Sequence, residues 1–194
     1  ETSYQERRIC LTPDAVNSLV SHGHKVMIEA GAGLSSSYTD KEYSDAGAEI
    51  TNDTKKVLSC PMLLKVEPLT MEEIKLVNAE TIVISAIQLK TRKKEYFEAL
   101  TKKKITALAF EYIKDEDGSY PAVKSLSEIA GTASILIASE LMINNQFGKG
   151  LLFGNITGVP PTDVVILGAG TVGEFAAKTA VALGANVKVF DNSI

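Results

Sequence analysis

Residues 163–191, DVVILGAGTVGEFAAKTAVALGANVKVFD, decide the class of fold to which this chain belongs. The apolar run at their start predicts a buried strand, and a glycine-rich turn follows it directly. An alanine-rich stretch then predicts a helix that stops at Gly184, and a second apolar run leads to Asp191. Strand, turn, helix and strand in this order predict a parallel βαβ unit.

The turn contains three glycines, each of which has a physical task in a dinucleotide site. Gly168 permits a tight turn, Gly170 lets a pyrophosphate approach the backbone, and Gly173 lets the helix pack closely on the strand. The free N–H groups and the dipole of the helix N-terminus attract phosphate. The predicted cofactor-binding residues of the turn are Gly168, Ala169, Gly170, Thr171, Val172 and Gly173.

An acid at the end of the second strand completes this pattern. Asp191 lies 23 residues after Gly168, where a carboxylate accepts hydrogen bonds from the ribose hydroxyls of the adenosine and repels a 2′-phosphate. We therefore expect NAD, and not NADP, as the cofactor. The alternative is a bare glycine turn in an α/β sheet, but the strand, the helix and the acid together favour the nucleotide.

The earlier part of the chain shows the same alternation. Residues 12–23 predict a helix with Thr12 as its N-cap. Short apolar runs at residues 62–66, 81–87 and 105–110 predict buried parallel strands, and residues 90–104 predict a helix between the last two. We expect an α/β fold with a parallel sheet, in which ligands lie beyond the carboxyl ends of the strands.

The composition favours small-molecule chemistry. A net charge of -4 with mixed Lys, Arg, Asp and Glu offers no footprint for nucleic acid. Cys10 and Cys60 belong to no Cys or Cys/His cluster, so we expect free thiols, no metal site and a cytoplasmic location. No apolar run approaches the roughly 20 residues that span a bilayer, and the first residues lack a signal-peptide core.

The last predicted strand is followed by only a few residues, up to Ile194. A complete dinucleotide domain needs two mononucleotide halves, and only the first strand, helix and second strand are found here. We therefore expect a truncated piece of a longer protein, with the nicotinamide half of the site elsewhere.

Four segments carry a resemblance to a known family. They are residues 6–50, which begin ERRICLTP, residues 63–68 (LLKVEP), residues 117–131 (DGSYPAVKSLSEIAG) and residues 158–173 (GVPPTDVVILGAGTVG). In this order they resemble the alanine dehydrogenase and pyridine nucleotide transhydrogenase family. The chain is more similar to the alanine dehydrogenases, because it has no counterpart of the arginine-rich loop typical of the transhydrogenase subunit.

The resemblance implies a division into domains. It implies a flavodoxin-like or Rossmann-like substrate domain with a parallel sheet at residues 1–125 and an interdomain helix at residues 126–147. The first part of a Rossmann NAD-binding domain then covers residues 148–194.

The resemblance also implies the substrate residues. Arg8 falls where the family places the arginine that binds the substrate carboxylate, although the adjacent Arg7 is an alternative. Lys65 falls where the family places a lysine at the substrate carbonyl or carboxylate. Gln88 occupies the catalytic position at which alanine dehydrogenases have a histidine, and an amide cannot transfer a proton at neutral pH. Glu111, Ser127 and Glu128 lie near the ends of predicted strands or helices, and they are given no role beyond that of neighbours of the site.

The expected function is an NAD-dependent amino acid dehydrogenase, most simply an alanine dehydrogenase that acts on a 2-amino or 2-keto acid. The resemblance also implies a homo-oligomer. Two alternatives stay open. One is a transhydrogenase-type subunit, and the other is an NAD-binding homologue that has lost or altered its catalysis because Gln88 replaces the histidine.

Overall fold

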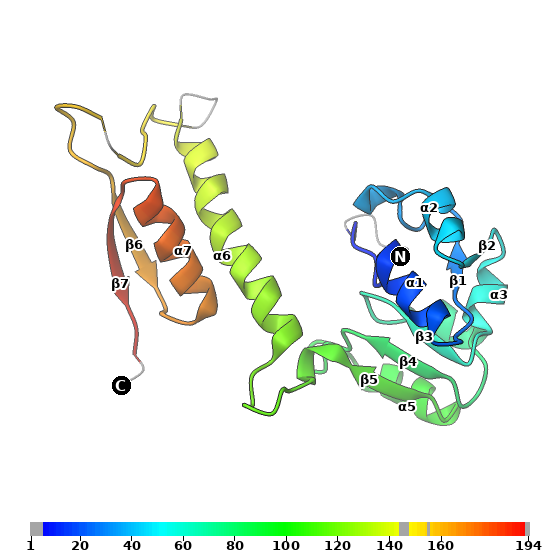
Figure 1. Ribbon diagram of the computed structural model, residues 1–194. Coiled ribbons are helices and arrows are strands. Elements are labelled where there is room, and N and C mark those ends of the chain that lie inside the picture. Colours follow the sequence, from blue (N-terminus) through cyan, green and yellow to red (C-terminus); the bar gives the residue numbers. More distant parts are fainter. Residues whose placement is uncertain (1–5, 144–147, 155, 193–194) are drawn as a thin grey trace. The chain divides into compact units, whose positions relative to one another are not determined.

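A computed structural model describes residues 6–143, 148–154 and 156–192 of the chain (Figure 1). The chain divides into two compact units, Glu1–Tyr112 and Ile113–Ile194, and each is described by itself.

The first unit contains two parallel sheets. Strands β1 (Met27–Glu29) and β2 (Glu49–Thr51) form a two-stranded sheet. Strands β3 (Met62–Leu64), β4 (Ile82–Ser85) and β5 (Thr106–Ala109) form a three-stranded sheet with β4 in the middle. All of these pairs are parallel, as the alternation of strands and helices predicted. The carboxyl ends of β3, β4 and β5 therefore lie at one edge of the sheet.

Short helices connect these strands. They are α1 (Pro13–Ser21), α2 (Asp40–Asp45), α3 (Thr54–Leu58), α4 (Met71–Leu76) and α5 (Lys94–Lys102), with 3₁₀ turns η1 (Leu34–Ser36) and η2 (Phe110–Tyr112). Thr12 caps α1 as predicted, because its hydroxyl accepts the N–H of Ala15. Thr39 and Thr70 each form a capping box with the glutamate three residues later, which satisfies N–H groups at the starts of α2 and α4.

Each sheet of the first unit has its own apolar cluster. The larger cluster surrounds the three-stranded sheet and consists of Leu58, Leu63, Leu69, Ile74, Val77, Val83, Ile87, Tyr96 and Leu100. The smaller one surrounds β1 and consists of Val16, Ile28, Tyr43 and Ala48. Burial of each large apolar side chain contributes roughly 1.5–3 kcal/mol. Cys10 and Cys60 form no disulfide with each other, and both are partly buried.

The second unit is a single βαβ element with a long helix beside it. The long helix α6 spans Pro121–Met142, β6 spans Asp163–Leu167, α7 spans Thr171–Ala182, and β7 spans Asn186–Phe190. Strands β6 and β7 pair in parallel, with Leu167 opposite Phe190. Helix α6 begins at Pro121 because proline suits the first helical position. Residues 144–147 of the predicted interdomain helix lie outside the described residues.

Helix α7 packs against both the two-stranded sheet and α6 (Figure 1). The buried residues of this core are Ile135, Phe153, Ala176 and Ala180. The opposite face of the sheet carries exposed apolar side chains, among which Leu167 is 83% exposed. In the part of the chain that the structure describes, no helix has the combined length and apolarity that crossing a membrane requires.

Candidate functional site

Polar side chains gather where the strands of the three-stranded sheet end. Lys65 directly follows β3, Gln88 lies shortly after β4, and Glu111 lies shortly after β5. This edge is where parallel α/β sheets bind their ligands. Two of the three residues, Lys65 and Gln88, are the ones that the sequence analysis placed at the substrate.

Lys65 is held by a largely buried ion pair. Its Nζ donates to Oε1 of Glu73 at 2.7 Å, and the two side chains are only 12% and 11% exposed. Its backbone N–H donates to the carbonyl oxygen of Ile84 on the neighbouring strand at 3.0 Å. Glu73 is also the third residue of α4, where its Oε2 accepts the N–H of Thr70 at 2.7 Å.

Opposing effects determine the protonation of Glu73. Burial raises the pKa of its carboxyl group, but hydrogen bonds and the charge of Lys65, together with the Thr70 hydrogen bonds, outweigh burial and hold this pKa below its usual value. Glu73 is therefore ionised at neutral pH, and it fixes the ammonium of Lys65 at the end of β3. Glu73 was not predicted as a site residue from the sequence, although the Thr70-to-Glu73 spacing marks a capping box.

Gln88 adopts an unusual backbone conformation that Glu111 supports. Its φ is 55°, in the left-handed region. The carboxylate of Glu111 accepts the N–H of Ile87 at 3.2 Å and the N–H of Gln88 at 2.7 Å. The carbonyl oxygen of Gln88 accepts the N–H of Thr91 at 3.0 Å. The structure thus brings together Gln88 and Glu111, which are 23 residues apart in the sequence, and the side chain of Gln88 is left exposed.

Arg92 is a member of this group that the sequence analysis missed. Its Nη2 lies 3.4 Å from Oε1 of Gln88, and its guanidinium carbon lies 5.7 Å from the centre of the Tyr96 ring. Burial raises the pKa of the Tyr96 hydroxyl, while the charge of Arg92 lowers it and that of Glu73 raises it further. Tyr96 thus responds to both charges. The signal in the sequence was an arginine four residues after Gln88.

Arg8 is placed by the chain that leads into α1. Its Nε and Nη2 donate to Oε1 and Oε2 of Glu6 at 2.8 and 2.6 Å, and its backbone N–H donates to Oε1 at 2.9 Å. The side-chain hydrogen bond from Arg8 has the largest effect on the pKa of Glu6. Together with the backbone hydrogen bonds and the charge of Arg8 it outweighs burial and holds the pKa of Glu6 below its usual value. The carbonyl oxygen of Arg7 accepts the hydroxyl of Ser36 at 2.6 Å. The guanidinium fork of Arg8 is thus aligned with a carboxylate, which is the group that it is expected to bind in a substrate.

The glycine turn of the second unit has the form that the sequence predicted. Gly168 has a φ of 110°, which favours glycine, and its N–H donates to the carbonyl oxygen of Phe190 at 2.7 Å. A Cβ atom on Gly173 would lie 1.9 Å from the carbonyl oxygen of Gly168, so only glycine allows α7 to approach the turn this closely. Gly170 is the N-cap of α7, and a Cβ atom there would meet nothing within 4 Å. Thr171 and Val172 are the first residues of α7.

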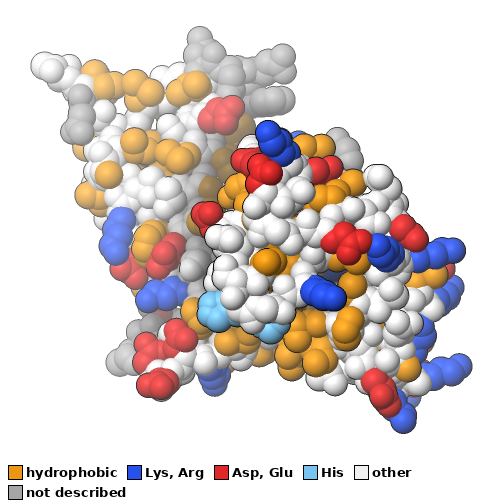
Figure 2. Space-filling model, turned by 45° about the vertical axis from the view of Figure 1, so that its right-hand side comes forward, with side chains coloured by type: hydrophobic (Ala, Val, Ile, Leu, Met, Phe, Trp, Pro, Cys, Tyr) orange, Lys and Arg blue, Asp and Glu red, His pale blue; other side chains and the backbone are white. Residues whose placement is uncertain are grey.

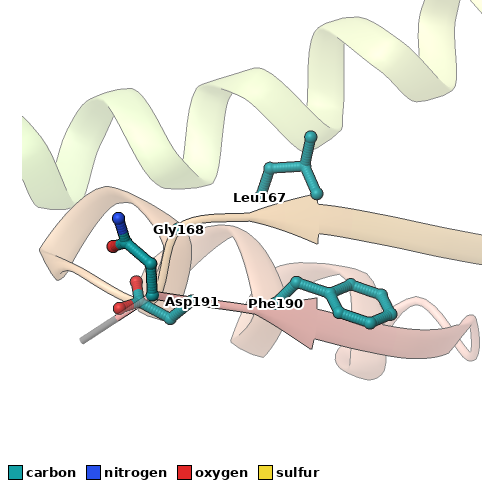
Figure 3. A pocket seen from close by; sticks show the side chains of 5 residues that line it. Leu167, Gly168, Phe190 and Asp191 are labelled. Atoms are coloured by element: carbon teal, nitrogen blue, oxygen red, sulfur yellow. The ribbon is translucent and has the colours of Figure 1, made fainter. Parts of the chain in front are cut away.

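Asp191 closes on this turn from the end of β7. Its Oδ2 accepts the N–H of Ala169. Asp191 also lines a hollow of about 380 Å³ at the carboxyl ends of both strands, and Figure 3 shows its carboxylate beside Gly168, with Leu167 and Phe190 on the adjoining strand ends. The hollow falls in the size range of small-ligand sites. It combines an apolar wall with a carboxylate and is next to the N-terminus of α7.

Among the described residues, no group of three or more His, Cys, Asp or Glu side chains is arranged to hold a metal ion. Figure 2 shows Lys and Arg side chains interspersed with Asp and Glu on the face in view. His22 is the C-cap of α1.

Comparison with known proteins assigns both units to one family. The N-terminal domain model of alanine dehydrogenase/PNT matches residues 1–130, and the C-terminal domain model matches residues 134–194. Alanine dehydrogenase from Methanococcus maripaludis is 41% identical over 192 residues, and that from Bacillus subtilis is 37% identical over 191 residues; each match covers 98% of this chain. The matched region is 51% of the first relative and 50% of the second, so the chain spans about half the length of these relatives.

Solved structures give the same result. An L-alanine dehydrogenase matches the whole chain with a TM-score of 0.94 at 36% identity, over 53% of its own length. A transhydrogenase from Sinorhizobium meliloti matches it with a TM-score of 0.85 at 26% identity, over 55% of its length. The two domain models together match residues 1–130 and 134–194, and the chain therefore belongs to the alanine dehydrogenase/PNT family.

Proposed function

We propose that the intact gene product containing this chain is an NAD-dependent amino acid dehydrogenase, most simply an alanine dehydrogenase. The reaction would convert L-alanine, NAD and water into pyruvate, ammonia and NADH. The observation that carries this proposal is the convergence of the glycine turn and Asp191 at one hollow of the second unit. Membership of the alanine dehydrogenase/PNT family supports it.

The residues of the second unit fit NAD. The N–H groups at the start of α7 would bind the pyrophosphate, and the open space at Gly170 would let it approach the backbone. Asp191 would accept hydrogen bonds from the ribose hydroxyls of the adenosine, and its charge would disfavour a 2′-phosphate. When bound, NAD supplies a carbon that accepts hydride from the substrate.

In the first unit, Lys65 and Arg8 would hold the substrate. The Lys65 ammonium would donate a hydrogen bond to the carbonyl oxygen of pyruvate and so stabilise the negative charge that develops there when ammonia adds to the carbonyl carbon. Glu73 keeps this ammonium at the end of β3, 2.7 Å from its own carboxylate oxygen. Arg8 would present its fork to the substrate carboxylate in exchange for Glu6.

Gln88 supports a second candidate function. The family position of a proton-transferring histidine is occupied by an amide, which can bind but not transfer a proton at neutral pH. An NAD-binding homologue without this catalysis would retain the glycine turn and Asp191. A transhydrogenase-type subunit is less favoured, because that structure is less similar to the chain than the alanine dehydrogenase is.

The domain assignment belongs to the same proposal. Residues 1–125 would hold the substrate, residues 126–147 would connect the domains, and residues 148–194 would begin the NAD-binding domain. The homo-oligomer and the cytoplasmic location stay predictions.

The test compares the intact gene product with a Gln88→His variant. NADH absorbance is followed with pyruvate and ammonium, and NADH binding is measured separately by fluorescence. Gln88→Asn is the matched control, because Asn and His are both enriched in the left-handed region and only His can transfer a proton.

Turnover by the unaltered protein is the expected result, and it would mean that another group transfers the proton. Turnover only by the histidine variant, or by neither protein while NADH still binds, would contradict the dehydrogenase proposal. Either result would favour the nucleotide-binding homologue.

A further inference from the structure

The guanidinium of Arg92 is held in place by two neighbours. It stacks near the ring of Tyr96, with 5.7 Å between the guanidinium carbon and the ring centre. Its Nη2 reaches Oε1 of Gln88 at 3.4 Å. Tyr96 itself is 5% exposed and belongs to the larger apolar cluster. Arg92 therefore lies against a buried part of the first unit.

The charge of Arg92 has no counterion among the residues that the structure describes. Within residues 6–143, 148–154 and 156–192, no carboxylate lies within ion-pair distance of its guanidinium. Its Nε is shielded from solvent and has no hydrogen-bond acceptor in the same described part of the chain. An arginine carries five N–H donors, and the neutral amide of Gln88 meets little of that capacity.

The two cations that the family resemblance places at the substrate differ from Arg92 in this respect. Lys65 is paired with Glu73 at 2.7 Å, and Arg8 is paired with Glu6 at 2.6 Å. A partly buried cation without a counterion is unfavourable, and an incoming anion relieves that cost. Among these three cations, Arg92 is the one that is ready to receive an anion without giving up a carboxylate of the protein.

Arg92 also lies in the right part of the fold. Gln88, its hydrogen-bond partner, follows β4 at the carboxyl edge of the parallel sheet, and Glu111 fixes the backbone of Gln88 there. The guanidinium lies over the ring of Tyr96, and Tyr96 packs in the same apolar cluster as Ile74, the residue next to Glu73. This edge is where an α/β sheet binds its ligand.

From this geometry we infer that Arg92 is a second substrate-binding arginine, which holds the carboxylate of a 2-oxo acid together with Arg8, with the amide of Gln88 orienting its guanidinium. A guanidinium presents a planar fork that matches a carboxylate. The inference rests on the proposed function, because it adds a residue to the substrate site proposed there. It also gives Gln88 a task that an imidazolium would perform poorly, since the amide oxygen accepts a hydrogen bond from a cation.

The experiment measures pyruvate binding by calorimetry on the intact gene product in the presence of saturating NADH. The variant is Arg92→Gln, which removes the charge, and Lys90→Ala is the matched control. Lys90 is exposed and lies two residues before Arg92. Its replacement by alanine also removes one positive charge, so both variants change the net charge equally. Turnover with pyruvate and ammonium is recorded on the same proteins.

We expect Arg92→Gln to weaken pyruvate binding about tenfold or more, because a hydrogen bond to a charged group is lost. Lys90→Ala should bind pyruvate as the unaltered protein does, and both variants should bind NADH normally. A loss of less than tenfold in Arg92→Gln, an equal loss in Lys90→Ala, or no pyruvate binding by the unaltered protein would overturn the inference.

Two further results distinguish a variant that fails to fold, and a protein that lacks the proposed activity, from an error in the inference itself. If Arg92→Gln also loses NADH binding, Arg92→Lys decides, since it keeps the charge but not the fork. That variant must bind NADH normally and pyruvate at least threefold more weakly. Arginine-dependent pyruvate binding without turnover in any of the proteins would refute the proposed activity and leave the inference standing.

Discussion

Lys65→Met tests whether the ion pair with Glu73 stabilises the first unit. The methionine keeps an unbranched stem of similar length but leaves the Glu73 carboxylate buried without its cation. The Nζ–Oε1 distance is 2.7 Å, and both side chains are about one tenth exposed. Breaking a buried pair costs about 3–5 kcal/mol. We expect the lower end, about 3 kcal/mol, because Glu73 keeps its hydrogen bonds to Thr70.

Glu73→Gln makes the reciprocal change. The amide oxygen can still accept the N–H of Thr70, but the Lys65 ammonium loses its counterion. The double variant leaves neither charge unpaired, so it should be about 2 kcal/mol more stable than the sum of the single effects predicts. Urea unfolding followed by tyrosine circular dichroism is the assay, because the chain has no Trp, and of its six tyrosines only Tyr120 lies outside residues 1–112. Single effects that add to within about 0.5 kcal/mol would refute the pairing.

The same pair predicts a pH dependence. The pKa of Glu73 lies below its ordinary value of 4.5 in the folded chain, so the unfolded chain binds more protons in acid. The stabilisation is therefore fully present above pH 4.5 and is lost as the pH falls through the lowered folded value. The difference in unfolding free energy between the unaltered protein and Lys65→Met should be constant from pH 6 to 7 and should shrink below about pH 4.5. A difference that does not change with pH would contradict this assignment.

Two other predictions concern the glycine turn and the loop after β4. Gly173→Ala places a Cβ atom 1.9 Å from the carbonyl oxygen of Gly168, so it should destabilise the second unit and abolish NADH binding. A Cβ atom at Gly170 would meet no protein atom within 4 Å. Gly170→Ala should therefore leave the circular dichroism unchanged while it weakens NADH binding. Equal folding defects in a thermal melt of the two variants would count against this division of tasks. Glu111→Ala removes the acceptor of the Gln88 N–H and should cost about 1–3 kcal/mol in urea unfolding, with Glu111→Gln recovering part of the loss. A cost below about 0.5 kcal/mol would show that the loop holds its conformation without the carboxylate.

Some elements were predictable because a local pattern is enough to form them. Thr12 and Pro13 mark the start of α1, and the glycine turn marks the passage from β6 to α7. These signals depend on the backbone conformation of a few adjacent residues. Helices α2, α3 and α4 were not predicted, because each has only five or six residues and its apolar pattern is too short to show a helical period.

The sequence by itself determined the α/β class, the βαβ unit of residues 163–191, the family, and the positions of Lys65, Gln88 and Asp191. Only the tertiary structure decided what those side chains meet. The pairing of Lys65 with Glu73, the support of Gln88 by Glu111, and the place of Arg92 beside Gln88 all follow from how the strand ends and helices pack. A local pattern specifies where a strand ends, but the neighbours of its last side chain are set by parallel pairing with strands 20 or more residues away.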